Sequence, residues 1–260
     1  MPQEKEASSR AAAAATGPAK PEFNRAAVDK AFEALRTYNY GSSRAALVPI
    51  DDAVVACRDD AGARKELERR LADLLPMNLP TPAKEFLCRK LVLIGSGDSV
   101  PPLSALLADE NVSHWARTAL EHIPGPEAVK ALRESLPKLR GLQKVGVITS
   151  LGTRRDAESV PALATLLKDP DAQMAGAAAA ALGNVGTPEA ARDLLEFRPN
   201  APDALRLVVA DACLTCAERL AATDKKAEAL AIYAALAGSA QPEHVRLAAK
   251  RGMSKATDKK

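Results

Sequence analysis

The residues best suited to chemistry are Cys213 and Cys216, which form a Cys-x-x-Cys motif. In a redox or haem-attachment setting this spacing brings two thiols together, and with a second pair it can hold zinc. No histidine follows the motif here, and no second cysteine pair has zinc spacing. Both cysteines also belong to an apolar stripe with helical spacing, made of Leu205, Val209, Ala212, Cys213, Cys216 and Leu220. The pattern favours buried core cysteines over a redox or metal role.

The three histidines and one glycine-rich stretch offer no stronger sign of catalysis. His114 and His122 stand eight residues apart on one predicted helix, so about 12 Å of helical rise separates them and they cannot share a metal ion. We interpret them, with His244, as surface residues. The stretch GSGDS at residues 95–99 follows a helix and lacks the Gly-Lys-Ser/Thr ending of a phosphate-binding loop. We therefore predict no catalytic residue, no metal and no cofactor, and hence a protein that is not an enzyme.

The composition predicts a thin, helical core. The chain has 260 residues, of which 47% are hydrophobic and only 3% aromatic, so Ala, Leu and Val supply most of the core. Small side chains suit helices that pack closely. No apolar run approaches the roughly 20 residues of a membrane span. We expect no membrane association and a cytoplasmic location, the alternative being an exported protein whose targeting segment is absent from this chain.

The positive charge is concentrated at the C-terminal end. The formal net charge is +3, and residues 250–260 carry five basic residues and one acidic residue, so the remainder of the chain has a net charge of −1. A nucleic-acid-binding protein usually carries its positive surface on the folded domain. The charge distribution therefore argues against a nucleic-acid partner, and no small-molecule substrate is expected.

The elements that would carry these residues follow an internal repeat of about thirty residues. One series has an apolar residue, two spacers, another apolar residue and then Gly or Pro: Leu91/Ile94/Gly95, Leu120/Ile123/Pro124, Ile148/Leu151/Gly152 and Leu182/Val185/Gly186. A second series has the same period: Val100/Leu103, Val129/Leu132, Val160/Leu163 and Ala191/Leu194. Apolar residues with helical spacing predict two helices in each unit. Because one such pair cannot bury its apolar stripe alone, the pairs are expected to stack into an elongated core.

Turn residues separate the predicted helices. The sequences GTPEA at 186–190 and PGPEA at 124–128 end one helix at glycine and start the next with proline followed by glutamate. Glycine suits the left-handed residue after a helix, and proline suits the first helical position. Ala177 to Ala181 are expected to lie inside a second helix that approaches its neighbours too closely for larger side chains.

The segment SVPALATLLKDPDAQMAGAAAAALGNVGTPEAA resembles the short HEAT repeat, the type also found in phycobilisome-lyase-like proteins. Pro101 and Pro161, Asp109 and Asp169, and the Leu-x-x-Ile/Val-Gly ending match the family pattern, most specifically over residues 98–195. The last helix pair also resembles a tetratricopeptide-like pair, which suits a capping unit.

This resemblance implies an all-α fold, an α-solenoid of about seven stacked antiparallel helix pairs in a right-handed superhelix. We expect a disordered leader over residues 1–24, the solenoid over residues 25–252, and a basic disordered tail over residues 253–260.

The resemblance also implies a non-catalytic scaffold that binds a protein or peptide partner along its concave face. Two alternatives stay open. One is an enzyme similar to phycobilisome lyases or to HEAT-like DNA glycosylases. The other is a structural spacer in a larger assembly.

Second helices line the concave face in HEAT solenoids, so position counting along them predicts a partner-binding groove. The residues two before the anchors Leu91, Leu120, Ile148 and Leu182 are Arg89, Thr118, Gly146 and Ala180. The residues six before these anchors are Glu85, His114, Leu142 and Gly176. Both rows change from polar to small or apolar, the profile of a helix or peptide site. The alternative is that the glycines and Ala180 are small because neighbouring helices crowd them. Trp115 is interpreted as core, or alternatively as an anchor beside the groove.

Overall fold

The computed structural model describes residues 24–238 and 241–257, and within these ranges it contains helices and no strand. The predicted leader lies outside the described residues, except for Asn24, which caps the first helix by accepting a hydrogen bond from the N–H of Ala27. The α-helices of the described ranges are α1 (Arg25–Leu35), α2 (Val48–Ala56), α3 (Ala61–Leu74), α4 (Thr81–Ile94), α5 (Val100–Ser104), α6 (Ser113–His122), α7 (Pro126–Ser135), α8 (Gly141–Thr153), α9 (Val160–Leu166), α10 (Ala172–Val185), α11 (Pro188–Phe197), α12 (Asp203–Ala222), α13 (Lys226–Leu236) and α14 (Glu243–Thr257).

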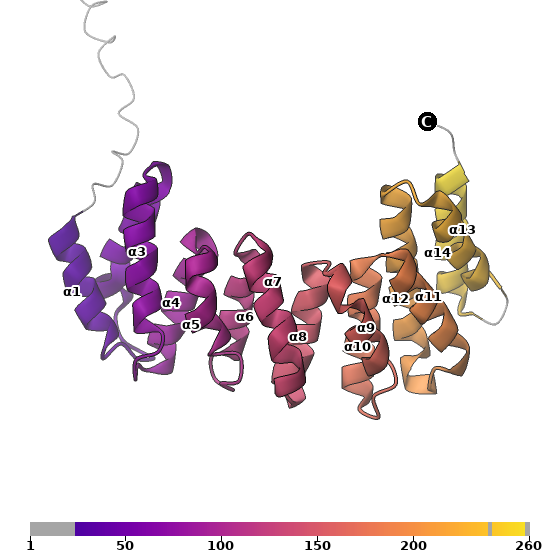
Figure 1. Cartoon of the computed structure of the whole chain (residues 1–260), viewed down its shortest axis with the longest axis horizontal. Coiled ribbons are helices and arrows are strands. Elements are labelled where there is room, and N and C mark those ends of the chain that lie inside the picture. Colours follow the sequence, from indigo (N-terminus) through magenta and orange to yellow (C-terminus); the bar gives the residue numbers. More distant parts are fainter. Residues whose placement is uncertain (1–23, 239–240, 258–260) are drawn as a thin grey trace, which may run out of the picture.

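The helices follow one another as seven pairs, from α1 with α2 to α13 with α14, in an elongated, gently arched row (Figure 1). The even-numbered helices pack against one another in an unbroken series from α2 to α14. The odd-numbered helices pack against each other from α3 to α7 and from α9 to α13. The result is two layers sharing one extended core, which confirms the predicted all-α solenoid. We call the even-numbered helices the second-helix layer.

The predicted turn chemistry is present in full at one glycine-proline junction and in part at the other. Gly186 ends α10 in the left-handed conformation, with φ +65°, and its N–H bonds to the carbonyl oxygen of Leu182. Pro188 then begins α11, behind Thr187, whose hydroxyl accepts a hydrogen bond from the N–H of Ala190. At the other junction the prediction that glycine ends the helix is wrong: Ile123 is the C-cap of α6, and Gly125, with φ +95°, is the N-cap of α7 directly before Pro126. Both junctions start the next helix with proline, as predicted, but only Gly186 ends a helix.

Close contact between neighbouring second helices explains the alanine run of α10. Ala178, Ala179 and Ala181 are buried. A Cβ added to Gly152 of α8 would lie 2.7 Å from the Cα of Ala181, and one added to Gly183 would meet the backbone of α12 at 2.6 Å. Real carbon atoms do not approach so closely, so glycine and alanine are what allow α8, α10 and α12 to pack at this separation.

The predicted C-terminal tail is wrong over residues 253–257, because α14 continues to Thr257. Met253 packs against the core and Ala256 is buried, extending the stripe that begins at Ala249 by spacings of four and three residues. This apolar spacing keeps the segment helical among its basic neighbours. The rest of the predicted tail, residues 258–260, lies outside the described residues.

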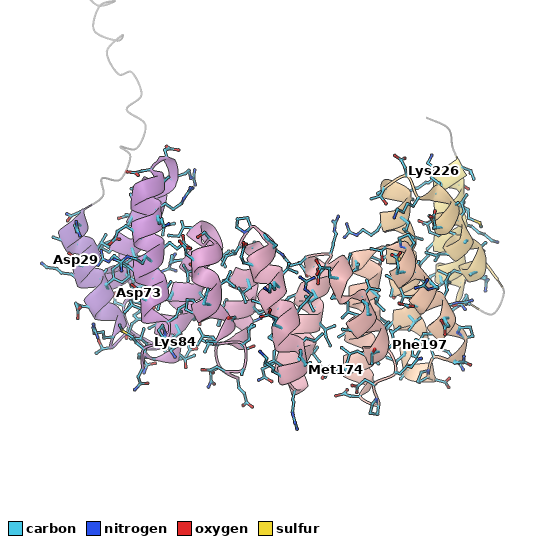
Figure 2. All side chains as sticks on the ribbon, in the orientation of Figure 1. Asp29, Asp73, Lys84, Met174, Phe197 and Lys226 are labelled. Atoms are coloured by element: carbon cyan, nitrogen blue, oxygen red, sulfur yellow. The ribbon has the colours of Figure 1, made fainter. Side chains whose placement is uncertain are left out.

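Side chains project from the ribbon along the whole row, from Asp29 near one end to Lys226 near the other (Figure 2). Across the described ranges, every helix falls short of the length and apolar character that a membrane crossing requires.

Candidate interaction surface

The eight residues predicted to line a groove lie on four consecutive helices of the second-helix layer. Helix α4 carries Glu85 and Arg89, α6 carries His114 and Thr118, α8 carries Leu142 and Gly146, and α10 carries Gly176 and Ala180. All eight are exposed or half-exposed. The structure therefore places both rows on surface that a partner can reach, in the order that the repeat spacing predicted.

Side-chain contacts connect the polar end of these rows across two helices. Arg89 pairs with Glu85, the Nη1 to Oε1 distance being 3.2 Å, and its guanidinium lies 5.6 Å from the centre of the Trp115 ring. The His114 ring meets Trp115 edge-on, with 5.0 Å between ring centres. Trp115 is half-buried against the core with one side under Arg89, and so has features of both sequence interpretations.

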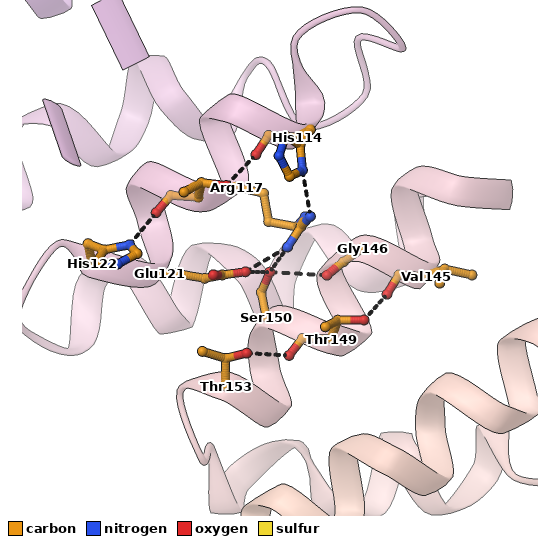
Figure 3. A network of polar contacts seen from close by, with 10 residues as sticks. His114, Arg117, Glu121, His122, Val145, Gly146, Thr149, Ser150 and Thr153 are labelled. Atoms are coloured by element: carbon orange, nitrogen blue, oxygen red, sulfur yellow. Dashed lines mark hydrogen bonds and ion pairs between the residues drawn. The ribbon is translucent and has the colours of Figure 1, made fainter. Parts of the chain in front are cut away.

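A polar cluster of Arg117, Glu121 and Ser150 joins α6 to α8 (Figure 3). Nη1 of Arg117 donates to Oε1 of Glu121 at 2.6 Å and to Oγ of Ser150 at 3.0 Å. The buried hydroxyl of Ser150 donates to the same Glu121 oxygen at 2.6 Å. Nη2 of Arg117 lies 3.0 Å from Nδ1 of His114, which must accept because a guanidinium can only donate. These groups satisfy one another, so the cluster fixes the geometry of α6 against α8.

Arg154, the residue that follows α8, caps the C-terminal end of α6. Arg154 donates from Nη1 to the carbonyl oxygens of Glu121 and Ile123, at 3.1 and 2.6 Å, and from Nη2 to that of Gly125 at 2.7 Å. The last carbonyls of a helix have no partner within it, so this arginine supplies the missing donors. Sequence reasoning missed this cap and the α6–α8 cluster. The only sequence signal was the i, i+4 spacing of Arg117 and Glu121 on a predicted helix.

The small residues of the two rows differ in what surrounds them. A Cβ added to Gly146 would lie 2.8 Å from Nε of Arg117, so the arginine side chain already occupies the space above this glycine. A Cβ added to Gly176 would meet Leu205 at 3.5 Å, an ordinary contact, and Ala180 is exposed. Crowding therefore accounts for Gly146, whereas Gly176 and Ala180 border accessible surface.

The C-terminal part of the surface is apolar. The side chain of Leu142 is 69% exposed, and α12 adds the exposed residues Leu207 and Val208. An added Cβ on Gly176 would come within 3.9 Å of Val208, so the apolar residues of α12 continue the surface of α10. The two rows of groove residues predicted from the sequence end at α10. The available sequence signal for α12 was that Leu207 and Val208 are apolar but lie off the stripe that contains Leu205 and Val209.

All four thiols are buried and free, as the apolar stripe predicted for Cys213 and Cys216. Burial raises the pKa of Cys88, Cys213 and Cys216 to about 12. A thiol is nucleophilic only as thiolate, so these groups are inert at neutral pH. All three histidines are exposed, which confirms their interpretation as surface residues. Within the described ranges, His, Cys, Asp and Glu side chains nowhere gather in threes in a way that could hold a metal ion.

Residues 144–213 match the HEAT repeats family. The chain therefore carries HEAT repeats, as the sequence resemblance implied. No match was found among curated proteins.

Three solved structures are similar to this chain at low sequence identity. An engineered protein of the Northeast Structural Genomics Consortium is 18% identical, with a TM-score of 0.44 over 88% of this chain and 69% of that one. A second engineered protein is 21% identical, with a TM-score of 0.38 over 80% and 96%. The complex of CpcE and CpcF of phycocyanin lyase from Nostoc sp. PCC7120 is 19% identical, with a TM-score of 0.42 over 94% and 97%.

Proposed function

We propose that this protein is a non-catalytic helical-repeat scaffold that binds a protein or peptide partner along its second-helix layer. The observation that carries the proposal is the set of exposed residues that the neighbouring helices from α4 to α12 present, polar at Arg89 and His114 and apolar at Leu142 and Leu207. Apolar side chains that stay exposed between polar ones are the composition of a protein-binding patch. Neighbouring repeats present such residues at a fixed spacing, which suits an extended or helical segment of a partner.

Two features of the candidate chemical groups support a non-catalytic role. The three thiols with a pKa of about 12 are too weakly acidic to act as nucleophiles. The carboxylate oxygen Oε1 of Glu121 accepts hydrogen bonds from both Arg117 and Ser150, so it is already used in joining α6 to α8.

The proposal is tested by affinity capture with the full chain as bait. The variant carries Leu142→Asp and Leu207→Asp, which places two charges on the apolar surface without touching the core. The control is Met77→Asp, an exposed apolar residue in the turn between α3 and α4. We expect a partner that the parent and the control retain and the double variant loses, measured by quantitative mass spectrometry.

Three other outcomes would favour a different binding site or a different function. A captured partner that survives the double variant would move the binding site away from α8 and α12. Retained pigment or DNA would favour the enzymatic alternative, and the absence of any captured partner would favour the structural spacer.

A further inference from the structure

A small cleft opens beside α4, at the N-terminal end of the second-helix layer. It lies between the segment 38–44 and α4, holds about 200 Å³, and is lined by Tyr40, Arg44, Glu85, Phe86, Arg89 and Lys90. Sites for cofactors and drug-sized ligands usually hold about 300 to 1,000 Å³. The cleft is therefore sized for one or two side chains of a bound chain. Two of its lining residues, Glu85 and Arg89, belong to the predicted groove.

A tight turn presents the Tyr40 ring at the edge of the cleft. The N–H of Ser42 bonds to the carbonyl oxygen of Asn39 at 3.0 Å, and Gly41 has φ +84°, as the third residue of such a turn requires. The side chains of Ser42 and Asn39 each accept a further backbone N–H within the turn. Tyr40 is nevertheless 73% exposed. A large aromatic side chain on a hydrogen-bonded turn loses little entropy on binding, which is typical of an interface anchor.

Two guanidinium groups of the cleft keep most of their donors available. Arg44 uses only Nη2, which donates to Asp51 at 3.1 Å, and Arg89 uses only Nη1, which donates to Glu85 at 3.2 Å. Their side chains are 55% and 54% exposed. The other nitrogens of these two arginines have no hydrogen-bond partner among the described residues. Each guanidinium can therefore donate to a second carboxylate, and arginine recognises carboxylates with paired N–H groups.

The charges around the cleft leave one cation in excess. Arg44 and Lys90 both pair with the single carboxylate of Asp51, while Arg89 pairs with Glu85. Three cations thus face two carboxylates. Lys90 and Arg44 also lie over the ring of the buried Phe86, at 4.9 and 5.8 Å from its centre, and this ring contributes to the lining of the cleft. An incoming carboxylate next to an apolar or aromatic residue complements this arrangement.

We infer that the cleft formed by Tyr40, Arg44, Phe86 and Arg89 binds an acidic peptide segment of the partner. A carboxylate side chain of that segment bonds to the available N–H groups of Arg44 and Arg89, and an adjacent apolar side chain packs on Tyr40. The inference rests on the proposed function, because it specifies which part of the scaffold binds the partner and the chemistry of the segment that is bound.

The test is selection of a random peptide library displayed on phage against the immobilised full chain. Binding of each enriched synthetic peptide is then measured by the emission of Trp115, the only tryptophan, whose ring lies 5.6 Å from the Arg89 guanidinium. The cleft variants are Arg44→Gln with Arg89→Gln, and separately Tyr40→Ala. The matched control is Arg206→Gln, an exposed arginine that pairs with Asp203 on α12. Binding to the cleft variants and to the control is followed by anisotropy of a labelled peptide.

We expect acidic peptides to be enriched, and the double arginine variant to weaken their binding by about tenfold or more. Tyr40→Ala should weaken it as well, while Arg206→Gln should leave it unchanged. Added salt should weaken binding to the parent, because the contacts are ionic and exposed. The double variant should fold normally, since both arginines are half-exposed and Asp51 keeps Lys90 as a partner.

Enrichment of peptides without acidic residues, or of peptides that bind the double variant as tightly as the parent, would overturn the cleft assignment while leaving a peptide-binding scaffold intact. Failure to select any peptide, combined with failure to capture a partner, would overturn both proposals.

Discussion

The side chain of Arg117 lies over Gly146, so that a Cβ added to this glycine would stand 2.8 Å from the arginine Nε. Replacing glycine by alanine inside a helix normally stabilises it by about 1 kcal/mol. In Gly146→Ala the methyl group would instead displace Arg117 from Glu121 and Ser150. We expect a net loss of about 1 kcal/mol or more in the free energy of unfolding, measured by chemical denaturation.

Two further variants isolate the cause of this loss. In an Arg117→Ala background the same Gly146→Ala change should become stabilising, because the obstructing side chain is gone. Gly176→Ala should stabilise the parent by about 0.5 to 1 kcal/mol, because the nearest atom of Leu205 would be 3.5 Å away. If the effects of Arg117→Ala and Gly146→Ala on the free energy of unfolding were additive, the packing of Arg117 over Gly146 would not be the cause of the loss.

The buried thiols should not react with thiol reagents in the folded protein. We expect Cys213 and Cys216 to resist a thiol-specific reagent until the chain unfolds, because a pKa of about 12 suppresses the thiolate. Cys216→Ser should cost about 1 to 3 kcal/mol, because the nearest acceptor, the carbonyl oxygen of Thr187, is 3.9 Å from the sulfur and too distant for a hydroxyl. Cys57→Ser should cost less, since the Val54 carbonyl oxygen lies at 3.4 Å. Rapid modification of the native protein would refute this prediction.

The stability contribution of Asp156 should change with pH in the direction opposite to that of a well-paired carboxylate. Its side chain is nearly buried and its Oδ2 has no hydrogen-bond partner among the described residues. Desolvation raises its pKa above the ordinary 3.8, and the nearby guanidinium of Arg133 only partly opposes this. As the pH rises through this range, the unfolded chain releases the proton more readily than the folded one. The folded state therefore loses stability.

The measurement compares parent and Asp156→Asn melting temperatures from about pH 3 to about pH 7. The parent should lose stability relative to the variant as the pH rises. The variant should still fold, because Arg133 retains its ion pair with Glu158. If the stability of the parent relative to the variant increased with pH instead, the effect of Arg133 on the pKa of Asp156 would outweigh that of desolvation.

The stacked layers predict an extended particle in solution. A compact chain of this length has a radius of gyration of about 18 Å. The row of helix pairs in Figure 1 should give a clearly larger value by small-angle X-ray scattering, together with a helical circular dichroism spectrum. A radius near the compact value would be incompatible with linear stacking.

Much of the architecture could be predicted from the sequence because it depends on local, periodic signals. The thirty-residue period, the glycine-proline junctions such as Gly186 and Pro188, and the stripe containing Cys213 each follow from backbone preferences and helical spacing. The anchor residues recur in four successive units. Together with the length of the chain, they predicted about seven helix pairs and placed Arg89 and Ala180 on the same layer.

Contacts between units were decided by the tertiary structure alone. The position of Arg117 over Gly146, the cap that Arg154 places on α6, and the joining of Tyr40 to Arg89 in one cleft link residues 29 to 49 positions apart. The extension of α14 to Thr257 likewise depended on whether Ala256 found a neighbour to bury it. The periodic pattern specifies which face of a helix is apolar. The distance and angle at which two faces meet arise only when the helices pack, and these decide which side chains touch.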